Sequence, residues 1–388
     1  MNACKRLVSL GERTFTQNIF FSVVKSRTNG QEASLGRSQS TAAHRSQDSD
    51  TTVTGEKLGL RAIDLAQKVQ QEKAKTRAAA KPPPVSGSEG RVAELKRFSL
   101  QLQNVHPNVL AKHLHKSVLY RDKDVVIINK PYGVPVREIP GVTSISSVLP
   151  VLSKMMAGTN LKTDSQLFPC MSLEKDSTGT LLLATSEETV EHILNLNKNN
   201  QVQRKYWVVT VGVPVPSEGL IDIPMLEKEI TGSQPHYKMA LSPCFKMNDT
   251  GDGLSKIRGH RQADPATTRY KVLDSSSGCS LIELQPYTGV KHQLRVHMAF
   301  ALACPILGDH KYSHWSKLAP QKLPKQVLKK LGLEQSKSRH IPLHLHERQL
   351  TLPRPDQENI VVSCPLPKYF MQTLKRLQLT FQHDEDNK

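Results

Sequence analysis

The spacing of apolar residues changes along the chain from helical periodicity to short continuous runs. Val92, Leu95, Phe98 and Leu102 recur at the three- and four-residue intervals of one helix face. This kind of pattern predicts helices over residues 91–102, 108–119, 145–156 and 187–196. Apolar and β-branched runs bounded by Gly, Pro and Ser predict strands. These runs cover residues 118–120, 124–131, 133–136, 180–184, 203–211, 267–274 and 280–284.

Three stretches have a pattern of their own. Residues 203–211 show little alternation, which predicts a strand buried on both faces. Residues 215–265 carry Pro, Gly, His and Lys with few long apolar runs, which predicts an insertion or an extended loop. The stretch from Lys322 to Arg339 is basic and helical in pattern. Such a run either contacts phosphates or forms a solvated face, and the pattern does not decide between the two.

The N-terminal part has a different composition. Residues 1–45 contain many Arg and Ser residues, and their only acidic residues are Glu12 and Glu32. Apolar patches accompany this charge, so we expect a mitochondrial transit peptide, with a disordered basic tail as the alternative. Residues 46–90 predict a charged helix followed by a linker rich in Pro, Gly and Ser.

Charge is the feature of the composition that bears most on function. The chain has 388 residues and a formal net charge of +18, which favours a polyanionic partner such as RNA over a small neutral ligand. A basic protein with a merely solvated surface is the alternative. The six cysteines include no Cys-x-x-Cys pair, so we expect neither zinc nor a disulfide framework. No apolar run approaches the ~18 residues of a membrane span.

Candidate chemistry centres on residues 170–179, a polar, charged turn that leads directly into the apolar run 180–184. Such a turn can present a carboxylate at the mouth of a sheet, and it offers Glu174 and Asp176. Four other stretches combine apolar runs with fixed polar residues. They are Val126–Val136, the Arg204-Lys205-Tyr206 strand start, residues 284–297 with 305–312, and residues 342–350.

These stretches resemble the motifs of the RluA-type pseudouridine synthases. Residues 288–297 are similar to the family's Thr-Gly-Arg-Thr-His-Gln-Ile-Arg-x-His, and residues 305–312 to its Pro-Ile-x-Gly-Asp-x-x-Tyr. Residues 171–179 follow the family's His-Arg-Leu-Asp-x-x-Thr-Ser/Thr-Gly, but Met171, Ser172 and Glu174 replace its histidine, arginine and aspartate. Val290 replaces a further arginine, and Lys291 supplies a cation next to it.

The resemblance implies an α+β pseudouridine synthase fold: a central mixed, mostly antiparallel sheet with flanking helices and an RNA-binding cleft. It also implies isomerisation of uridine to pseudouridine without a metal or a cofactor. The implied organisation is a helical lead-in over residues 91–117, a catalytic domain over residues 118–383 and a disordered tail over residues 384–388.

The resemblance also implies roles for single residues. Glu174, Tyr206 and Arg295 occupy the catalytic positions: a carboxylate, a tyrosine that stacks on the base, and an arginine that pairs with the carboxylate. Asp176 is the alternative nucleophile. His292 and His297 are expected to pack and to form hydrogen bonds. The implied substrate-binding residues are Thr178, Gly179, Lys291 and Leu345.

Two functional hypotheses remain open at this stage. The first is an active mitochondrial pseudouridine synthase that acts in the matrix on rRNA, tRNA or mRNA. The second is an inactive RNA-binding protein on the same fold, acting in ribosome assembly or RNA stability. The later motifs favour the first hypothesis, and the changes at Met171, Ser172 and Glu174 favour the second. RNA-granule or ribosome-assembly proteins are the candidate protein partners.

Overall fold

The computed structural model describes residues 87–157, 166–231, 235–242, 245–247, 254–256, 262–354 and 358–381. All of them belong to one compact unit, residues 80–388. The predicted transit peptide, residues 46–86 of the predicted helix and linker, and the tail at residues 384–388 lie outside the described residues. Residues 87–90, predicted as the end of the linker, form the first turn of a helix.

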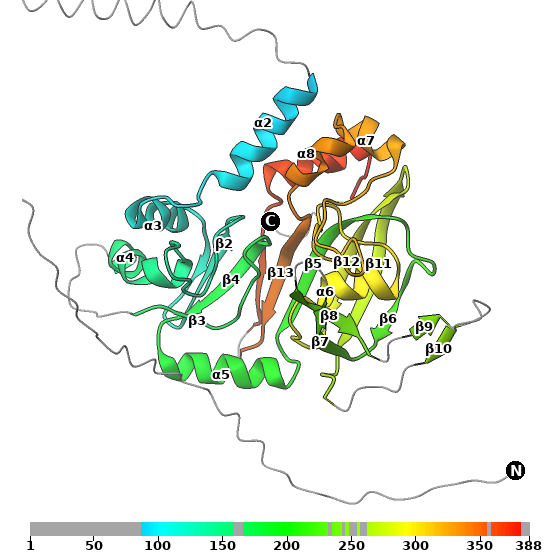
Figure 1. Cartoon of the computed structure of the whole chain (residues 1–388). Helices are drawn as coiled ribbons and strands as arrows, with labels where there is room; N and C mark the ends of the chain where they lie inside the picture. Colours follow the sequence, from blue (N-terminus) through cyan, green and yellow to red (C-terminus); the bar gives the residue numbers. More distant parts are fainter. Residues whose placement is uncertain are drawn as a thin grey trace, which may run out of the picture. The chain divides into compact units, whose positions relative to one another are not determined.

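A single ten-stranded sheet forms the centre of this unit (Figure 1). Its strands run in the order β1-β2-β4-β13-β5-β12-β11-β6, with β3 paired to β4 and β14 paired to β13. Neighbouring strands are antiparallel except for β13 and β4, which are parallel. The strands are β1 (Val118–Arg121), β2 (Val125–Lys130), β3 (Phe168–Pro169), β4 (Thr178–Ala184), β5 (Gln203–Val211), β6 (Glu218–Asp222), β11 (Thr267–Ser276), β12 (Cys279–Pro286), β13 (Leu345–Leu352) and β14 (Ile360–Ser363).

Helices cover both faces of the sheet, so the prediction of a mixed, mostly antiparallel sheet with flanking helices is confirmed. On one face, α3, α4 and α6 pack on apolar side chains of β2, β4, β5 and β12. On the other face, α2, α7 and α8 pack on β5 and β12, and α5 packs on β2 and β4. The helices are α2 (Gly87–Leu100), α3 (Pro107–Lys116), α4 (Ile145–Ala157), α5 (Glu187–Lys198), α6 (Gln293–Val296), α7 (Lys325–Leu331) and α8 (Lys368–Leu377), with a π-helical turn η1 (His297–Ala301) and a 3-10 helix η2 (Gln335–His340).

Two predictions of secondary structure are wrong. Residues 133–136 form no strand, because Gly133 has a φ of 78° and Pro131 and Pro135 lack the N–H that a ladder requires. The region 215–265 is not simply a loop, since it contributes β6 and two hairpins. These are β7 (Met225–Ile230) with β8 (His236–Leu241), and β9 (Phe245–Met247) with β10 (Leu254–Lys256).

Two other predictions need their bounds corrected. The helix expected over residues 108–119 ends at Lys116, and Val118 already pairs with Ile128 of β2. The basic run from Lys322 to Arg339 is divided between α7 and η2, because Gly332 ends α7 in the left-handed conformation with a φ of 68°.

Candidate active site

The turn before β4 is held by hydrogen bonds from the side chain of Lys130, at the end of β2, and from the backbone N–H of Gly133. The Lys130 ammonium lies 3.1 Å from the carbonyl oxygen of Lys175 and 2.8 Å from that of Ser177. The Gly133 N–H donates to the same Lys175 carbonyl at 2.9 Å. Lys130 is fully buried, and burial lowers its pKa to about 7, although the nearby carboxylates of Asp176 and Glu174 favour its charge. A buried lysine side chain thus fixes the backbone that carries Glu174.

Glu174 forms one end of a chain of three charges. Arg295 of α6 donates to Oε2 of Glu174 at 2.6 Å and binds both carboxylate oxygens of Asp309, at 2.8 and 2.7 Å. Burial opposes the charge of Arg295, but Asp309 and then Glu174 outweigh burial and raise its pKa. Burial alone would raise the pKa of Asp309, but Arg295 lowers it. Arg295 therefore stays cationic, and its planar fork orients Glu174.

A second ion pair supports the tyrosine of this site. Arg204 binds Glu347 of β13 through two hydrogen bonds, at 2.9 and 2.6 Å. The guanidinium of Arg204 also lies 5.3 Å from the ring centroid of Tyr206. Burial raises the pKa of Tyr206 well above its usual value, so its hydroxyl stays protonated. Leu345 is paired with Val208 across the β5–β13 ladder, and Val208 lies two residues after Tyr206 on β5. Tyr206 and Leu345 therefore lie on the same face of the sheet.

These groups surround one cavity of about 460 Å³. Among the residues predicted for the site, Glu174, Tyr206, Lys291 and Leu345 line it. Lys291 lies at an exposed position, where it forms a 2.8 Å ion pair with Glu227 of β7. The other residues that line the cavity are Arg137, Ser172, Leu173, Ser177, Arg204, Pro286, Thr288, Gly289, Val290, His292, Gln293 and Leu294.

The structure places two predicted substrate-binding residues elsewhere. Thr178 points to the opposite face of the sheet, where its hydroxyl lies 2.8 Å from Nδ1 of His346. Gly179 has a φ of 124°, and a Cβ there would lie 2.3 Å from the Glu347 carbonyl oxygen. Neither residue lines the cavity of Glu174. The reason is the parallel pairing of β4 with β13: Gly179 permits the close approach of the backbones, and Thr178 faces away from the cavity.

Asp176 also lies apart from Glu174. In an extended segment the two carboxylates would share a face, but the chain turns at Lys175 and Asp176. The charge of Asp176 acts on Lys130 and Tyr132, and its side chain does not line the cavity.

Sequence reasoning assigned no role to several residues of this network. Asp309 stands in the Gly-Asp motif, where a fixed acidic residue after glycine was the available signal. Arg204 lies two residues before Tyr206 on the same strand, so strand alternation places both on one face. Glu347 had no such signal, because an isolated Glu in a short strand more often faces solvent.

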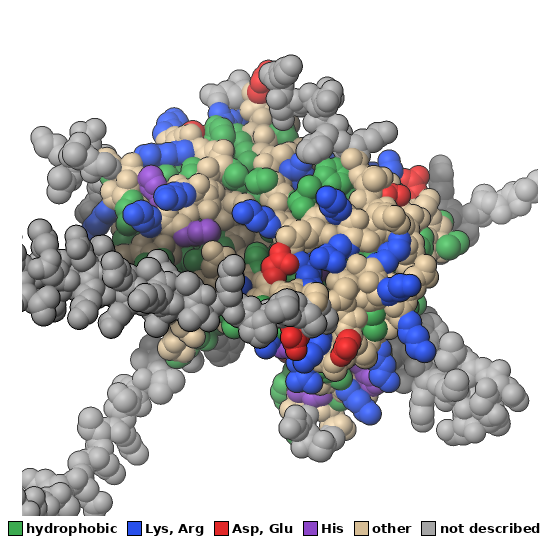
Figure 2. Space-filling view, turned by 90° about the horizontal axis from the view of Figure 1, so that it is seen from above, with side chains coloured by type: hydrophobic (Ala, Val, Ile, Leu, Met, Phe, Trp, Pro, Cys, Tyr) green, Lys and Arg blue, Asp and Glu red, His purple; other side chains and the backbone are tan. Residues whose placement is uncertain are grey.

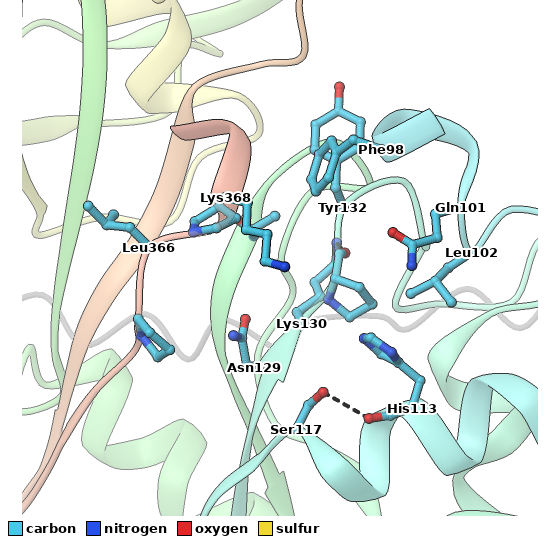
Figure 3. Close-up of a pocket in the computed structure, with 14 residues that line it drawn as sticks. Phe98, Gln101, Leu102, His113, Ser117, Asn129, Lys130, Tyr132, Leu366 and Lys368 are labelled. Carbon is cyan, nitrogen blue, oxygen red and sulfur yellow. Dashed lines mark hydrogen bonds between the residues drawn. The ribbon is translucent and has the colours of Figure 1, made fainter. Parts of the chain in front are cut away.

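A second pocket lies between the end of α2, the end of α3 and the start of α8 (Figure 3). Its volume is about 360 Å³, and Phe98 and Tyr132 stand together on one side of it. Thr178 lines this pocket, whereas the preceding residue, Ser177, lines the cavity of Glu174. The start of β4 therefore separates this pocket from the cavity of Glu174.

Within the described residues, no group of three His, Cys, Asp or Glu side chains is arranged to hold a metal ion. None of the described helices combines the length and the apolar character that a membrane crossing requires.

The fold and the Glu174–Arg295–Asp309 chain, whose last two members are buried, define a class of RNA-modifying enzyme. A family model described as RNA pseudouridylate synthase matches residues 124–300. The chain belongs to this family and is an RNA pseudouridine synthase, as the relatives below also show.

"Pseudouridylate synthase RPUSD4, mitochondrial" of Danio rerio is 55% identical over 334 residues, which cover 86% of this chain and 93% of the relative. The Homo sapiens protein of the same name is 48% identical over 326 residues, covering 83% and 85%. The solved structure "Human RNA Pseudouridylate Synthase Domain Containing 4" matches with a TM-score of 0.64 and 48% identity, covering 71% of this chain and 98% of that one.

Proposed function

We propose that this chain isomerises uridine to pseudouridine in mitochondrial RNA, with Glu174 as the reacting carboxylate. The isomerisation detaches uracil from the ribose at nitrogen and rejoins it through carbon. A carboxylate that attacks the sugar, or helps to break the glycosidic bond, has to be ionised and held at near-attack distance.

The observation that carries this proposal is the 2.6 Å contact between Arg295 and Oε2 of Glu174. The other carboxylate oxygen of Glu174, Oε1, accepts no hydrogen bond from any described residue. The Glu174 side chain is 27% exposed toward the cavity. One oxygen is therefore anchored while the other is available to the substrate. The side chain of Glu174 is long enough to contact Arg295 directly, and Asp176 takes no part in this contact.

The remaining wall of the cavity suits a base. Tyr206 and Leu345 offer an aromatic ring and an apolar side chain on the same face of the sheet, and the Arg204 guanidinium lies 5.3 Å from the centroid of that ring. In this proposal a uridine leaves the RNA stack, at a cost of a few kcal/mol, and enters this cavity. A volume of about 460 Å³ falls in the range of small-molecule sites.

The charge of the protein supports an RNA substrate. Figure 2 shows a face on which Lys and Arg side chains far outnumber Asp and Glu. Because RNA releases counterions when its phosphates are neutralised, such a face favours binding regardless of base sequence.

The relatives support the location and the substrate class of this proposal. The names of the relatives include the word mitochondrial, and "Mitochondrial mRNA pseudouridine synthase RPUSD3" of Homo sapiens is 31% identical over 301 residues. We place this chain in the matrix, imported by residues 1–45, with rRNA, tRNA or mRNA as substrate. Ribosome-assembly or RNA-granule proteins are the partners that would give access to these RNAs.

The test is pseudouridine mapping on mitochondrial RNA from cells with and without this protein. We expect specific positions to lose pseudouridine without the protein and to regain it with the wild-type chain but not with Glu174→Ala. Recovery with Glu174→Ala would exclude the assigned carboxylate. An unchanged map, with RNA binding intact, would instead favour the inactive RNA-binding alternative.

A further inference from the structure

A histidine beside Glu174 has an unusual backbone conformation. His292 precedes α6 with a φ of 57°, in the left-handed region that disfavours a non-glycine residue. This conformation points the ring at Glu174: its Nε2 lies 3.8 Å from Oε2, the same oxygen that Arg295 binds at 2.6 Å. The side chain of His292 is only 18% exposed. The backbone of His292 is strained, and its ring is largely buried next to the carboxylate. Packing alone does not explain this arrangement.

The other ring nitrogen shows which tautomer is present. Nδ1 of His292 lies 2.6 Å from the hydroxyl of Tyr312. That hydroxyl accepts the N–H of Met239 at 3.3 Å, and no described residue offers its proton an acceptor other than Nδ1. The Tyr312 hydroxyl therefore donates to Nδ1, which leaves the ring hydrogen of a neutral His292 on Nε2, facing Glu174.

His292 is neutral at physiological pH. Burial lowers its pKa to about 3, and the charges of Arg295, Lys311 and Lys291 act in the same direction. The ring thus offers Glu174 an N–H donor that brings no charge and does not protonate the carboxylate.

We propose that His292 is a positioning residue for Glu174: the Tyr312 hydroxyl keeps the ring hydrogen on Nε2, and this N–H closes on Oε2 when substrate fills the cavity. At 3.8 Å the two atoms are about 1 Å too far apart for a hydrogen bond, and catalytic contacts of this kind often tighten only in the substrate complex. The proposal rests on Glu174 being the reacting carboxylate.

A second donor matters because the carboxylate belongs to glutamate. Its side chain has one more rotatable bond than aspartate, so a single contact to Arg295 leaves more conformations open. With Arg295 and His292 both on Oε2, the direction of Oε1 toward the substrate is defined. Tyr312 supports both donors, since the Arg295 guanidinium also lies 5.0 Å from its ring centroid.

The β7–β8 hairpin holds Tyr312 in place. Besides the Met239 N–H, this hairpin supplies the buried Lys238, whose ammonium donates to three carbonyl oxygens of the loop around Tyr312. The acceptors are Lys311 at 2.6 Å, His314 at 2.9 Å and Lys317 at 2.9 Å. This segment of the 215–265 region therefore reaches the active site through Tyr312.

The first test reads the tautomer directly. In the full-length protein labelled with ¹⁵N-histidine, the ring nitrogens of His292, assigned by their loss in His292→Gln, should show hydrogen on Nε2 only. In Tyr312→Phe, which keeps the ring but removes the hydroxyl, a mixture of tautomers should appear. Hydrogen on Nδ1 of the wild-type residue would overturn the proposal. This readout needs no turnover, so it separates failure here from failure of the Glu174 assignment.

The second test measures single-turnover conversion of RNA. Tyr312→Phe and His292→Ala should slow conversion about ten-fold or more, as the loss of a hydrogen bond to a charged group does, with RNA affinity unchanged. His292→Gln, whose amide can accept from Tyr312 and donate to Glu174, should recover part of the rate. Tyr270→Phe is the control, because it removes another buried tyrosine hydroxyl bond, to Pro216, away from the site. A Tyr312→Phe rate equal to that of Tyr270→Phe, or no recovery with His292→Gln, would overturn the proposal.

Discussion

At the scale of single residues, one methylene group decides how Glu174 is interpreted. From the sequence, the longer side chain suggests a carboxylate displaced by about 1 Å from its productive position. In the structure this length is used to reach Arg295 at 2.6 Å. The sequence contains Arg295 and Asp309 as motif residues, but it does not show that Asp309 binds the arginine from the side opposite Glu174. The contact of Arg295 with Glu174 joins residues 121 positions apart, which periodicity does not report.

Glu174→Asp tests whether this length matters. The shorter side chain withdraws the carboxylate by about 1 Å from Arg295, and a misplacement of that size costs about 100-fold in rate. We expect single-turnover conversion to slow by this order while RNA affinity stays unchanged. A faster Glu174→Asp enzyme would show that the aspartate geometry is better and that the contact to Arg295 adapts to it.

At the scale of elements, the strands and helices with strong patterns were predictable. The apolar run of residues 180–184 and the helix face of residues 187–196 correspond to β4 and α5. The hairpins within residues 215–265 were missed because β7 is mostly exposed, with charged residues at its centre. The positions of Thr178 and Gly179 depend on the parallel pairing of β4 with β13, which no local pattern indicates.

Gly179→Ala tests the close pairing of β4 with β13. The added Cβ would lie 2.3 Å from the Glu347 carbonyl oxygen, so backbone has to move, and we expect a loss of about 3 kcal/mol or more in the free energy of unfolding. Gly141→Ala is the control, since Gly141 also has a positive φ but an added Cβ there meets nothing within 4 Å. We expect it to cost about 1 kcal/mol. Urea unfolding measures both, and equal losses would contradict the close approach.

Lys130 gives the turn before β4 a pH dependence. Its pKa in the folded protein is about 7, below the ordinary value of 10.5, so the unfolded state binds more protons between these two values. The contribution of Lys130 to stability therefore rises with pH from about 7 to 10.5 and is constant below that window.

The measurement is the difference in unfolding free energy between wild type and Lys130→Met at pH 6.5 and pH 9.5. We expect this difference to shift in favour of the wild type at the higher pH. Lys198→Met, which alters an exposed lysine at the end of α5, is the control and should not reproduce this shift. A difference that is independent of pH would mean that Lys130 keeps its ordinary pKa.

At the scale of the whole molecule, charge was the most direct prediction from the sequence. The net charge of +18 gives the total, and the structure shows where part of it gathers. Burial first, and then the charges of Lys96, Arg339 and Lys337, lower the pKa of His340, so α2 and η2 together present a concentrated positive field. The sequence places Lys96 more than 200 positions from Arg339, and only the packing of α2 against η2 joins them.

RNA binding should reflect this field. Affinity should fall with rising salt, by about 10³-fold between 50 and 200 mM if about six phosphates are neutralised. Replacing Lys96, Lys337 and Arg339 together by Gln should reduce the salt slope. Replacing the exposed Lys123, Lys154 and Lys198, which removes the same charge elsewhere, should change it less. Equal effects of the two triple variants would assign RNA binding to net charge and not to this face.

The central claim is that Glu174, held by Arg295, is the carboxylate that reacts. Conversion of uridine in mitochondrial RNA by purified wild type, Glu174→Ala and Asp176→Ala tests it most directly, with RNA affinity measured for each. We predict that Glu174→Ala binds RNA normally but forms no pseudouridine, because the reacting group contributes to the transition state more than to ground-state binding. Asp176→Ala should retain conversion, since Asp176 lies outside the cavity. Conversion that survives Glu174→Ala but is lost in Asp176→Ala would contradict the account.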